Sequence, residues 1–226
     1  MRTTSLRAAM FTTCVLLAHA CVMDEGIPSR EEVDPANAVD TRAPGNEATD
    51  TPAPIEKILD HDYQVQQTSY WCGPAATRIV LSARISPPSQ QTLANELGTT
   101  TNGTDWIGQV TGVLNDDLGA QYYKTTEMPN DPPTPSQRDR LWTDVVHSID
   151  NDFAIVANIV APPGNQPPGY PSNQTIYHYF AVVGYNAETR KVYIADSANF
   201  SGNQHYWLTL DKLATLIPPK GYSSLQ

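Results

Sequence analysis

The chain has 226 residues, of which 40% are hydrophobic and 17% charged, and this composition fits one globular domain with a sizeable core plus some non-globular chain. Its formal net charge is -10, and the sequence contains no block of Lys or Arg. Because phosphate binding needs a positive field, nucleic acid is excluded as a partner.

The first twenty residues are typical of a secretory signal peptide. Arg2 and Arg7 precede an apolar stretch, and Ala18-His19-Ala20 has the small-x-small pattern of a cleavage site. The apolar stretch is too short to span a bilayer comfortably, and no later segment is more apolar. We therefore expect residues 1–20 to be removed and the mature protein to be secreted or extracytoplasmic rather than membrane-spanning.

The cysteines leave two questions open. Cys21 follows the expected cut and resembles the lipid acceptor of bacterial lipoproteins, although Ala18 stands where those sites usually carry Leu. A lipid anchor at Cys21 and an unanchored secreted protein are both compatible with this pattern. Cys21 and Cys72 can also pair as a disulfide, but the terminal position of Cys21 favours a single free thiol at Cys72.

Residues 21–55 are expected to form a disordered, acidic, Pro-rich linker. Between Val22 and Pro54, eight acidic residues and two arginines leave a net charge of about -6. Such a segment has too few large apolar residues to offset its ordering entropy. A propeptide is the alternative, but the apolar anchors of a blocking segment are missing. The folded domain is then expected to cover residues 56–226.

Helices are expected first in this domain. Apolar residues recur at helical spacing, and the helices are bounded by the N-cap Ser89, the stop residues Gly98 and Gly119, and Pro135 at a helix start. The expected helices cover residues 74–81, 89–97 and 104–118 and a fourth segment that begins after Pro135.

The second half of the domain is expected to be a sheet. Short runs rich in β-branched and aromatic residues, separated by turn signals, predict four strands of a mostly antiparallel sheet at 153–160, 177–186, 191–197 and 205–210, followed by a short helix at 211–216. Helices followed by strands indicate an α+β fold rather than an alternating βαβ fold. The Pro-rich segment that starts at residue 161 is expected to be a long exposed loop that covers one side of the cleft, with a lid role as the alternative.

Cys72 stands at the start of the first expected helix, directly before Gly73 and Pro74. The partial positive charge at a helix N-terminus favours a thiolate, which is the reactive form of cysteine. A nucleophilic thiol also needs a base and a group that orients the base. The chemistry therefore has to be completed by residues from elsewhere in the fold.

Histidine and aspartate candidates lie at the ends of two neighbouring expected strands. His178 opens one strand and Asp196 closes the next, so a hairpin can bring the imidazole and the carboxylate together. His205 is the alternative base if the strand register differs. Gln66 can offer its amide to a developing oxyanion, and Gln64 and Gln67 are rivals on spacing alone. No clustered His and Cys spacing predicts a metal site, and no cofactor is expected.

The segments "QQTSYWCGPAA", "HYFAVVGYN" and "VYIADSA" together resemble the papain-like cysteine peptidases, most closely the branch of the bacteriocin-processing, double-glycine-leader peptidases. The resemblance covers Tyr63 to Leu216. It implies a papain-like α+β fold with Cys72 as nucleophile, His178 as general base and acid, Asp196 as the orienting group and Gln66 as the oxyanion donor. Those peptidase domains are fused to a transporter in the cytoplasm, so their substrate does not carry over to this chain.

The expected function is therefore an exported cysteine peptidase that cleaves peptide or isopeptide bonds through a thioester acyl-enzyme. Its expected partner is a peptide or protein substrate. Two alternatives stay open: a non-catalytic peptide-binding module with the same fold, and an acyltransferase or cell-wall amidase that uses the same three residues.

Overall fold

The computed structural model describes residues 55–226, so the expected signal peptide, the acceptor at Cys21 and most of the acidic linker lie outside the described residues. The helices are α1 Cys72–Ser82, α2 Gln90–Glu96, α3 Ile107–Leu118, α4 Pro135–Asp150 and α5 Leu210–Leu216. The strands are β1 Glu56–Ile58, β2 Tyr123–Glu127, β3 Ile155–Ala161, β4 Ile176–Asn186, β5 Lys191–Ala195, β6 His205–Thr209 and β7 Gly221–Leu225. A 3₁₀ turn, Phe200–Gly202, lies between β5 and β6.

The strands form one antiparallel sheet in the order β2-β7-β3-β4-β5-β6, with β1 paired to β4. β4 is the centre of this sheet, and its residues from His178 to Tyr185 are all buried, without the alternation of a half-exposed strand. Such continuous burial is typical of a strand that is covered on both faces.

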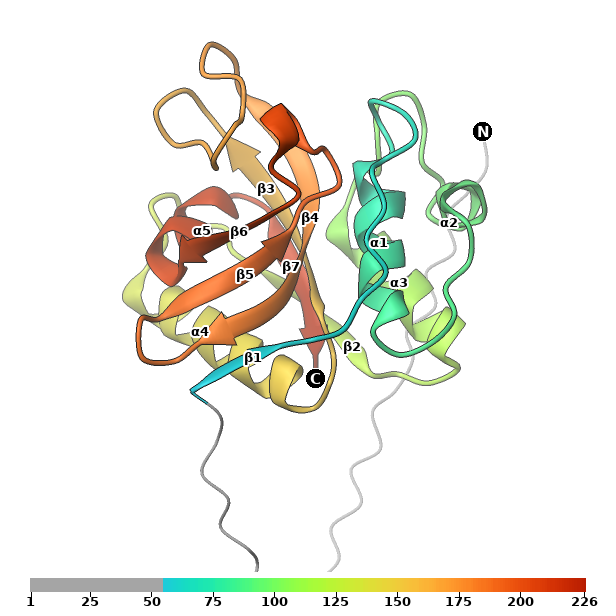
Figure 1. Ribbon diagram of the computed structural model, residues 1–226, viewed down its shortest axis with the longest axis horizontal. Helices are drawn as coiled ribbons and strands as arrows, with labels where there is room; N and C mark the ends of the chain where they lie inside the picture. Colours follow the sequence, from blue (N-terminus) through green and yellow to red (C-terminus); the bar gives the residue numbers. More distant parts are fainter. Residues whose placement is uncertain (1–54) are drawn as a thin grey trace, which may run out of the picture. The chain divides into compact units, whose positions relative to one another are not determined.

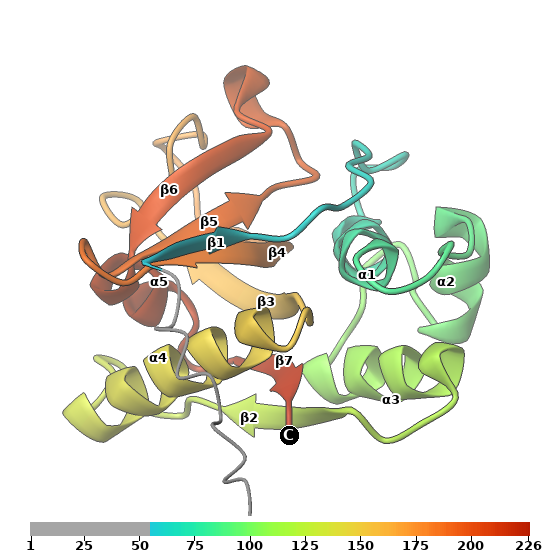
Figure 2. The same cartoon turned by 60° about the horizontal axis from the view of Figure 1, so that its bottom comes forward.

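The helices cover the sheet from two sides. α1 packs against β3 and β4, while α3 packs against β2 and β7. α4 contacts β4, β7 and α5. Figures 1 and 2 show α1, α2 and α3 grouped on one side of the sheet, with α4 and α5 on the other. The α+β fold class predicted from the sequence is confirmed.

The helix ends follow the expected signals. Ser89 caps α2 by accepting a hydrogen bond from the Thr92 amide, and Gly119 ends α3 in the left-handed conformation with φ 68°. Pro135 starts α4 behind the N-cap Thr134. α3 begins at Ile107 rather than at residue 104, because Trp106 has an extended backbone. Among residues 55–226, no helix is both long and apolar enough to cross a membrane.

The prediction of four strands was too low, since the described sheet also contains β1, β2 and β7. β1 has only three residues, and β2 and β7 carry Thr and Ser where an apolar strand pattern would need larger side chains. Two of these hydroxyls are bound by α3: Thr111 is hydrogen bonded to Thr125 at 2.6 Å and to Ser223 at 2.9 Å. These polar strands form the end of the sheet that packs against α3.

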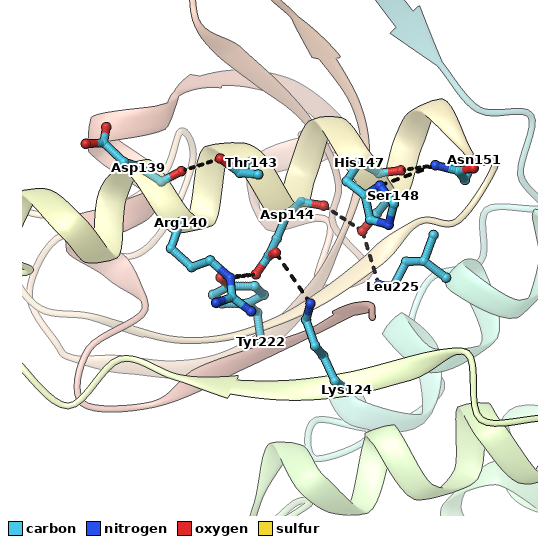
Figure 3. A network of polar contacts seen from close by, with 10 residues as sticks. All are labelled: Lys124, Asp139, Arg140, Thr143, Asp144, His147, Ser148, Asn151, Tyr222 and Leu225. Atoms are coloured by element: carbon cyan, nitrogen blue, oxygen red, sulfur yellow. Dashed lines mark hydrogen bonds and ion pairs between the residues drawn. The ribbon is translucent and has the colours of Figure 1, made fainter. Parts of the chain in front are cut away.

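A buried polar network fixes α4 against the same strands (Figure 3). The Asp144 carboxylate accepts hydrogen bonds from Arg140 Nε at 2.8 Å and from the Tyr222 hydroxyl at 2.8 Å, and Lys124 Nζ lies 3.6 Å away. Asp144 is 4% exposed, so its charge is balanced by the two cations rather than by water. This network ties α4 to β2 and β7.

Candidate active site

Cys72 is the first residue of α1, and its thiol is free and only 9% exposed. The start of α1 lies against the segment that leads into α3: a Cβ added at Gly73 would come within 2.3 Å of Thr104 Oγ1. A cavity of about 230 Å³ opens beside the thiol. Its lining includes Cys72, Thr104, Asn158, Tyr177, His178 and Lys220. The helix start therefore places the sulfur at the wall of a cavity.

His178, near the start of β4, joins the thiol to a carboxylate. Its Nε2 lies 2.8 Å from Asp196 Oδ1, and its ring is hydrogen bonded to the Cys72 side chain. Because Nε2 faces the carboxylate, Nδ1 is the nitrogen left for the sulfur. The hairpin of β4 and β5 therefore brings together the imidazole and carboxylate that the sequence placed at neighbouring strand ends.

The electrostatics of this group favour a charged thiolate and imidazolium. Burial raises the pKa of the Cys72 thiol, but the hydrogen bond and charge of His178 and the amides of Tyr179 and Gly73 outweigh it, so the pKa is lowered. Burial lowers the pKa of His178, but the charge and hydrogen bond of Asp196, with those of Cys72, raise it to about 10. Opposite charges stabilise each other in this buried site.

Asp196 directly follows β5 and is fully buried. Its Oδ1 accepts hydrogen bonds from His178 Nε2 at 2.8 Å and from the Ala198 amide at 3.0 Å. Its Oδ2 accepts from the hydroxyls of Tyr170 and Tyr206, each at 2.7 Å. Burial raises the pKa of Asp196, but the charge and hydrogen bond of His178 and the two tyrosines lower it below the ordinary value. The carboxylate is therefore held as an anion.

Gln66 lies on the Asp196 side of the site, but its amide points elsewhere. Its Nε2 donates to the Thr68 carbonyl at 2.9 Å, and its Oε1 accepts from Ser197 Oγ at 3.4 Å. The rivals contact α2 instead: Gln64 Oε1 accepts from Gln90 Nε2 at 3.3 Å, and the backbone N–H of Gln67 donates to Gln90 Oε1 at 3.0 Å. Of the three glutamines, Gln66 is the one that contacts Ser197, the residue next to Asp196.

His205, the alternative base, lies away from the thiol. It pairs with Ala195 across β5 and β6, and its Nε2 lies 2.9 Å from His61 Nε2. It also stacks on Tyr193 with ring centroids 5.7 Å apart. The strand register therefore favours His178. Within residues 55–226, no group of three or more His, Cys, Asp and Glu side chains is placed to hold a metal ion.

Two residues of the site were missed in the sequence. The segment that starts at residue 161 was expected to be an exposed loop, but its Tyr170 is only 7% exposed because its hydroxyl binds Asp196. Tyr206 gave a weak signal: it lies on the buried face of β6 with Leu208, and a buried tyrosine hydroxyl needs a partner. For Tyr170, the surrounding Pro and Gly residues predicted a loop and gave no sign that the tyrosine is buried.

The cavity continues away from the thiol. A second cavity of about 190 Å³ shares Asp105, Asn158 and Lys220 with the first. Trp106, which is 54% exposed, and Glu127 line its far part. The two cavities therefore adjoin one another, and Tyr177 and Trp106 add aromatic side chains to a lining that also carries charged and polar residues.

Several solved structures are similar to this chain. A C39-like peptidase from Bacillus anthracis is 13% identical with a TM-score of 0.49, over 76% of this chain and 98% of that chain. The peptidase domain of Streptococcus ComA, a bifunctional ABC transporter of a quorum-sensing pathway, is 16% identical with a TM-score of 0.46, over 74% of this chain and 100% of that chain. Xylellain, a cysteine protease from Xylella fastidiosa, is 11% identical with a TM-score of 0.46, over 77% of this chain and 87% of that chain.

A comparison with curated proteins gives no match. The sequence model of the Peptidase_C39 like family matches residues 58–216, which is well over half of the chain. The matched residues run from β1 to the end of α5 and include Cys72, His178 and Asp196. The resemblance found in the sequence motifs is confirmed by this match, and the chain belongs to the Peptidase_C39 like family of cysteine peptidases.

Proposed function

We propose that this protein is an exported cysteine peptidase that hydrolyses peptide or isopeptide bonds through a thioester acyl-enzyme. The observation that carries the proposal is the continuous chain of hydrogen bonds from Cys72 through His178 to Asp196 at the wall of a cavity. A nucleophile, a base and an orienting group in contact are what covalent acyl transfer requires.

In the first half of the reaction, the Cys72 thiolate attacks the carbonyl carbon of the scissile bond. The imidazolium of His178 then gives its proton to the leaving amine as the C–N bond breaks, and a thioester remains on Cys72. In the second half, a water molecule gives a proton to His178 and attacks the thioester. The C–S bond breaks, the carboxylic product leaves, and the pair of thiolate and imidazolium is regenerated.

The remaining groups act on charge and orientation. Asp196 stabilises the imidazolium and keeps Nε2 of His178 turned toward itself, so that Nδ1 stays at the sulfur. Amides at the start of α1 can donate to the oxyanion that forms beside Cys72. In this proposal Gln66 supplies a further donor, after its amide turns from the Thr68 carbonyl toward the cavity.

Export belongs to the same proposal. Its support is the pattern of residues 1–20, with two arginines, an apolar stretch and a small-x-small cleavage pattern. The mature N-terminus is then Cys21, and mass spectrometry of the protein isolated from its native host separates an acylated Cys21 from an unmodified one.

The rate of Cys72 alkylation by iodoacetamide against pH tests the catalytic proposal. A thiolate should persist well below pH ~8.5, the ordinary pKa of a free thiol, and this low-pH reactivity should be lost in His178→Ala. The matched control is His205→Ala, which removes the other histidine near a strand start and should leave the profile unchanged.

A thiol that titrates at its ordinary pH in the wild-type protein would contradict the proposal and favour a peptide-binding module. If the thiol is reactive, peptide libraries with and without an added amine separate hydrolysis from acyl transfer, because only a transferase forms the amide with the added amine.

A further inference from the structure

We propose that Tyr170 and Tyr206 are positioning residues of this site, whose hydroxyls hold one oxygen of Asp196 and limit how strongly its carboxylate attracts the imidazolium of His178. The inference rests on the proposed function, because it assigns a task to residues behind the catalytic group. It also makes the Pro-rich segment between β3 and β4, which was expected to be a loop beside the cleft, part of the site.

The geometry of the carboxylate carries the first step. Both hydroxyl contacts to Oδ2 are 2.7 Å long, within the range of charge-assisted O–H···O⁻ bonds. The other oxygen, Oδ1, is taken by His178 and by the Ala198 amide. An ionised carboxylate has about four acceptor positions, and all are used here. Asp196 therefore cannot rotate without breaking at least two strong hydrogen bonds.

The two tyrosines reach Asp196 from separate elements, and both are held in place. Tyr206 is 8% exposed and lies on β6, where it pairs with Ile194 of β5. Tyr170 is 7% exposed, and its ring packs on Phe200 with centroids 4.6 Å apart. The hydroxyls are thus preorganised, and the carboxylate does not have to order them.

The backbone next to Tyr170 is docked onto the 3₁₀ turn behind the site. Gly169 has φ +81°, and an added Cβ would lie 2.5 Å from the Phe200 carbonyl oxygen. Ser201 Oγ donates to the Gly169 carbonyl at 3.1 Å. A close approach at positive φ needs glycine, so the chain is shaped to bring Tyr170 to Asp196.

The expected effect follows from where the charge is concentrated. Each hydroxyl stabilises the anionic carboxylate, and it does so most when His178 is neutral, because no imidazolium then shares that charge. Removing a hydroxyl therefore destabilises the neutral-imidazole state more than the imidazolium state. The pKa of His178 should rise, and the imidazolium should give up its proton less readily to a leaving amine. The titratable groups around the pair are Tyr63, Cys72, Tyr170, Tyr179 and Tyr206, with Asp105, Tyr177 and Lys220 on the wall of the cavity that His178 lines.

The test follows the titration of the His178 imidazole by NMR in the full-length chain. The measurement is made in a Cys72→Ala background, because loss of the thiol removes its contribution to the pKa of His178 and brings the titration to lower pH. The imidazole signal is assigned by its loss in His178→Gln. Tyr170→Phe and Tyr206→Phe should each raise the pKa of His178 by about one unit, as expected for the loss of one hydrogen bond to a charged group. The double variant should raise it further.

The matched control is Tyr222→Phe, which removes a buried tyrosine hydroxyl that donates to Asp144, the other buried aspartate among residues 55–226, at 2.8 Å. It should change the stability of the fold but leave the His178 titration where it is. Equal shifts in the control and the site variants would indicate general loosening of the fold and would overturn the inference.

A folded Tyr170→Phe or Tyr206→Phe with an unmoved His178 titration would also overturn it. If both variants fail to fold, uniform fluorotyrosine in the Cys72→Ala chain replaces them: a more acidic hydroxyl is a stronger donor and should lower the pKa of His178, and no change would refute the inference. These titrations need no turnover. If wild-type Cys72 titrates as an ordinary thiol but the pKa of His178 shifts in the tyrosine variants, only the proposed peptidase activity is rejected. If Cys72 is reactive at low pH but the pKa of His178 does not shift, only the positioning role of Tyr170 and Tyr206 is rejected.

Discussion

Among residues 55–226, two buried aspartates accept hydrogen bonds from tyrosine hydroxyls, and their other partners decide what each can do. Asp144 is balanced by two cationic side chains, Arg140 and Lys124, and has no imidazole as an ion-pair partner among the described residues. Asp196 is balanced by His178, whose charge depends on one proton that can move. The first arrangement can only hold elements together, whereas the second can support proton transfer to and from a neighbouring thiol.

At the residue scale, Gln66→Ala separates the oxyanion donor from the rest of the site. If Gln66 turns toward the oxyanion as proposed, its loss should lower kcat by about 10² to 10³, the range found for removal of one such donor, with little change in KM. Peptide turnover measured over a range of substrate concentrations gives both constants. Cys72 alkylation, which forms no oxyanion, should keep the rate and pH profile of the wild type.

Gln64→Ala serves as the control, because Gln64 faces Gln90 of α2. Equal losses of kcat in both variants would assign the effect to the shared segment before α1 rather than to the amide of Gln66. An unchanged kcat in Gln66→Ala would remove Gln66 from the mechanism and leave the amides at the start of α1 as the donors.

At the element scale, the site is made where the start of α1 meets the β4–β5 hairpin. The helix supplies the thiol and its local field, and the hairpin supplies the imidazole and carboxylate at fixed separation. The approach is close enough to exclude a side chain at position 73, because Thr104 Cβ would lie 2.9 Å from the added atom. The glycine after Cys72 is therefore favoured by packing.

This packing predicts opposite effects for two Gly→Ala substitutions. Gly73→Ala should destabilise the fold by about 1–3 kcal/mol, because an overpacked contact forces α1 and Thr104 apart, and it should slow Cys72 alkylation near neutral pH. Gly112→Ala, inside α3, has nothing within 4 Å of the new Cβ and should stabilise the fold by about 0.5–1 kcal/mol. Chemical denaturation of both variants gives the two free energies of unfolding. A stabilised Gly73→Ala with a normal thiol would show that the contact relaxes without cost.

At the scale of the whole molecule, the sequence predicted what depends on apolar periodicity and on caps. The helices and the four apolar strands were expected because their buried faces repeat along the chain, and Cys72, His178 and Asp196 were expected because each stands at the end of such an element. β2 and β7 were missed because their contacts with α3 include hydroxyl pairs, which leave no apolar pattern. Tyr170 was missed because only the tertiary fold brings its loop to Asp196.

The division of the chain into a linker and a domain is a prediction at the same scale. Comparing a chain that starts at residue 21 with one that starts at residue 55 tests it. The acidic segment has few large apolar residues to bury, so its removal should change the free energy of unfolding by no more than about 0.5 kcal/mol, as for surface changes in general. Both chains should unfold in one cooperative transition and should show the same pH profile of Cys72 alkylation.

A chain that starts at residue 59 is the control, because it also loses β1, including the Lys57 ion pair with Asp152 at 2.7 Å. It should be clearly less stable than the chain from residue 55, since the ladder with β4 is lost along with that pair. Loss of cooperative unfolding on removal of residues 21–54 would refute the linker. A faster-reacting thiol after that removal, with unchanged stability, would instead identify the segment as a propeptide that covers the cleft, because only a segment lying against Cys72 can slow its alkylation without supporting the fold.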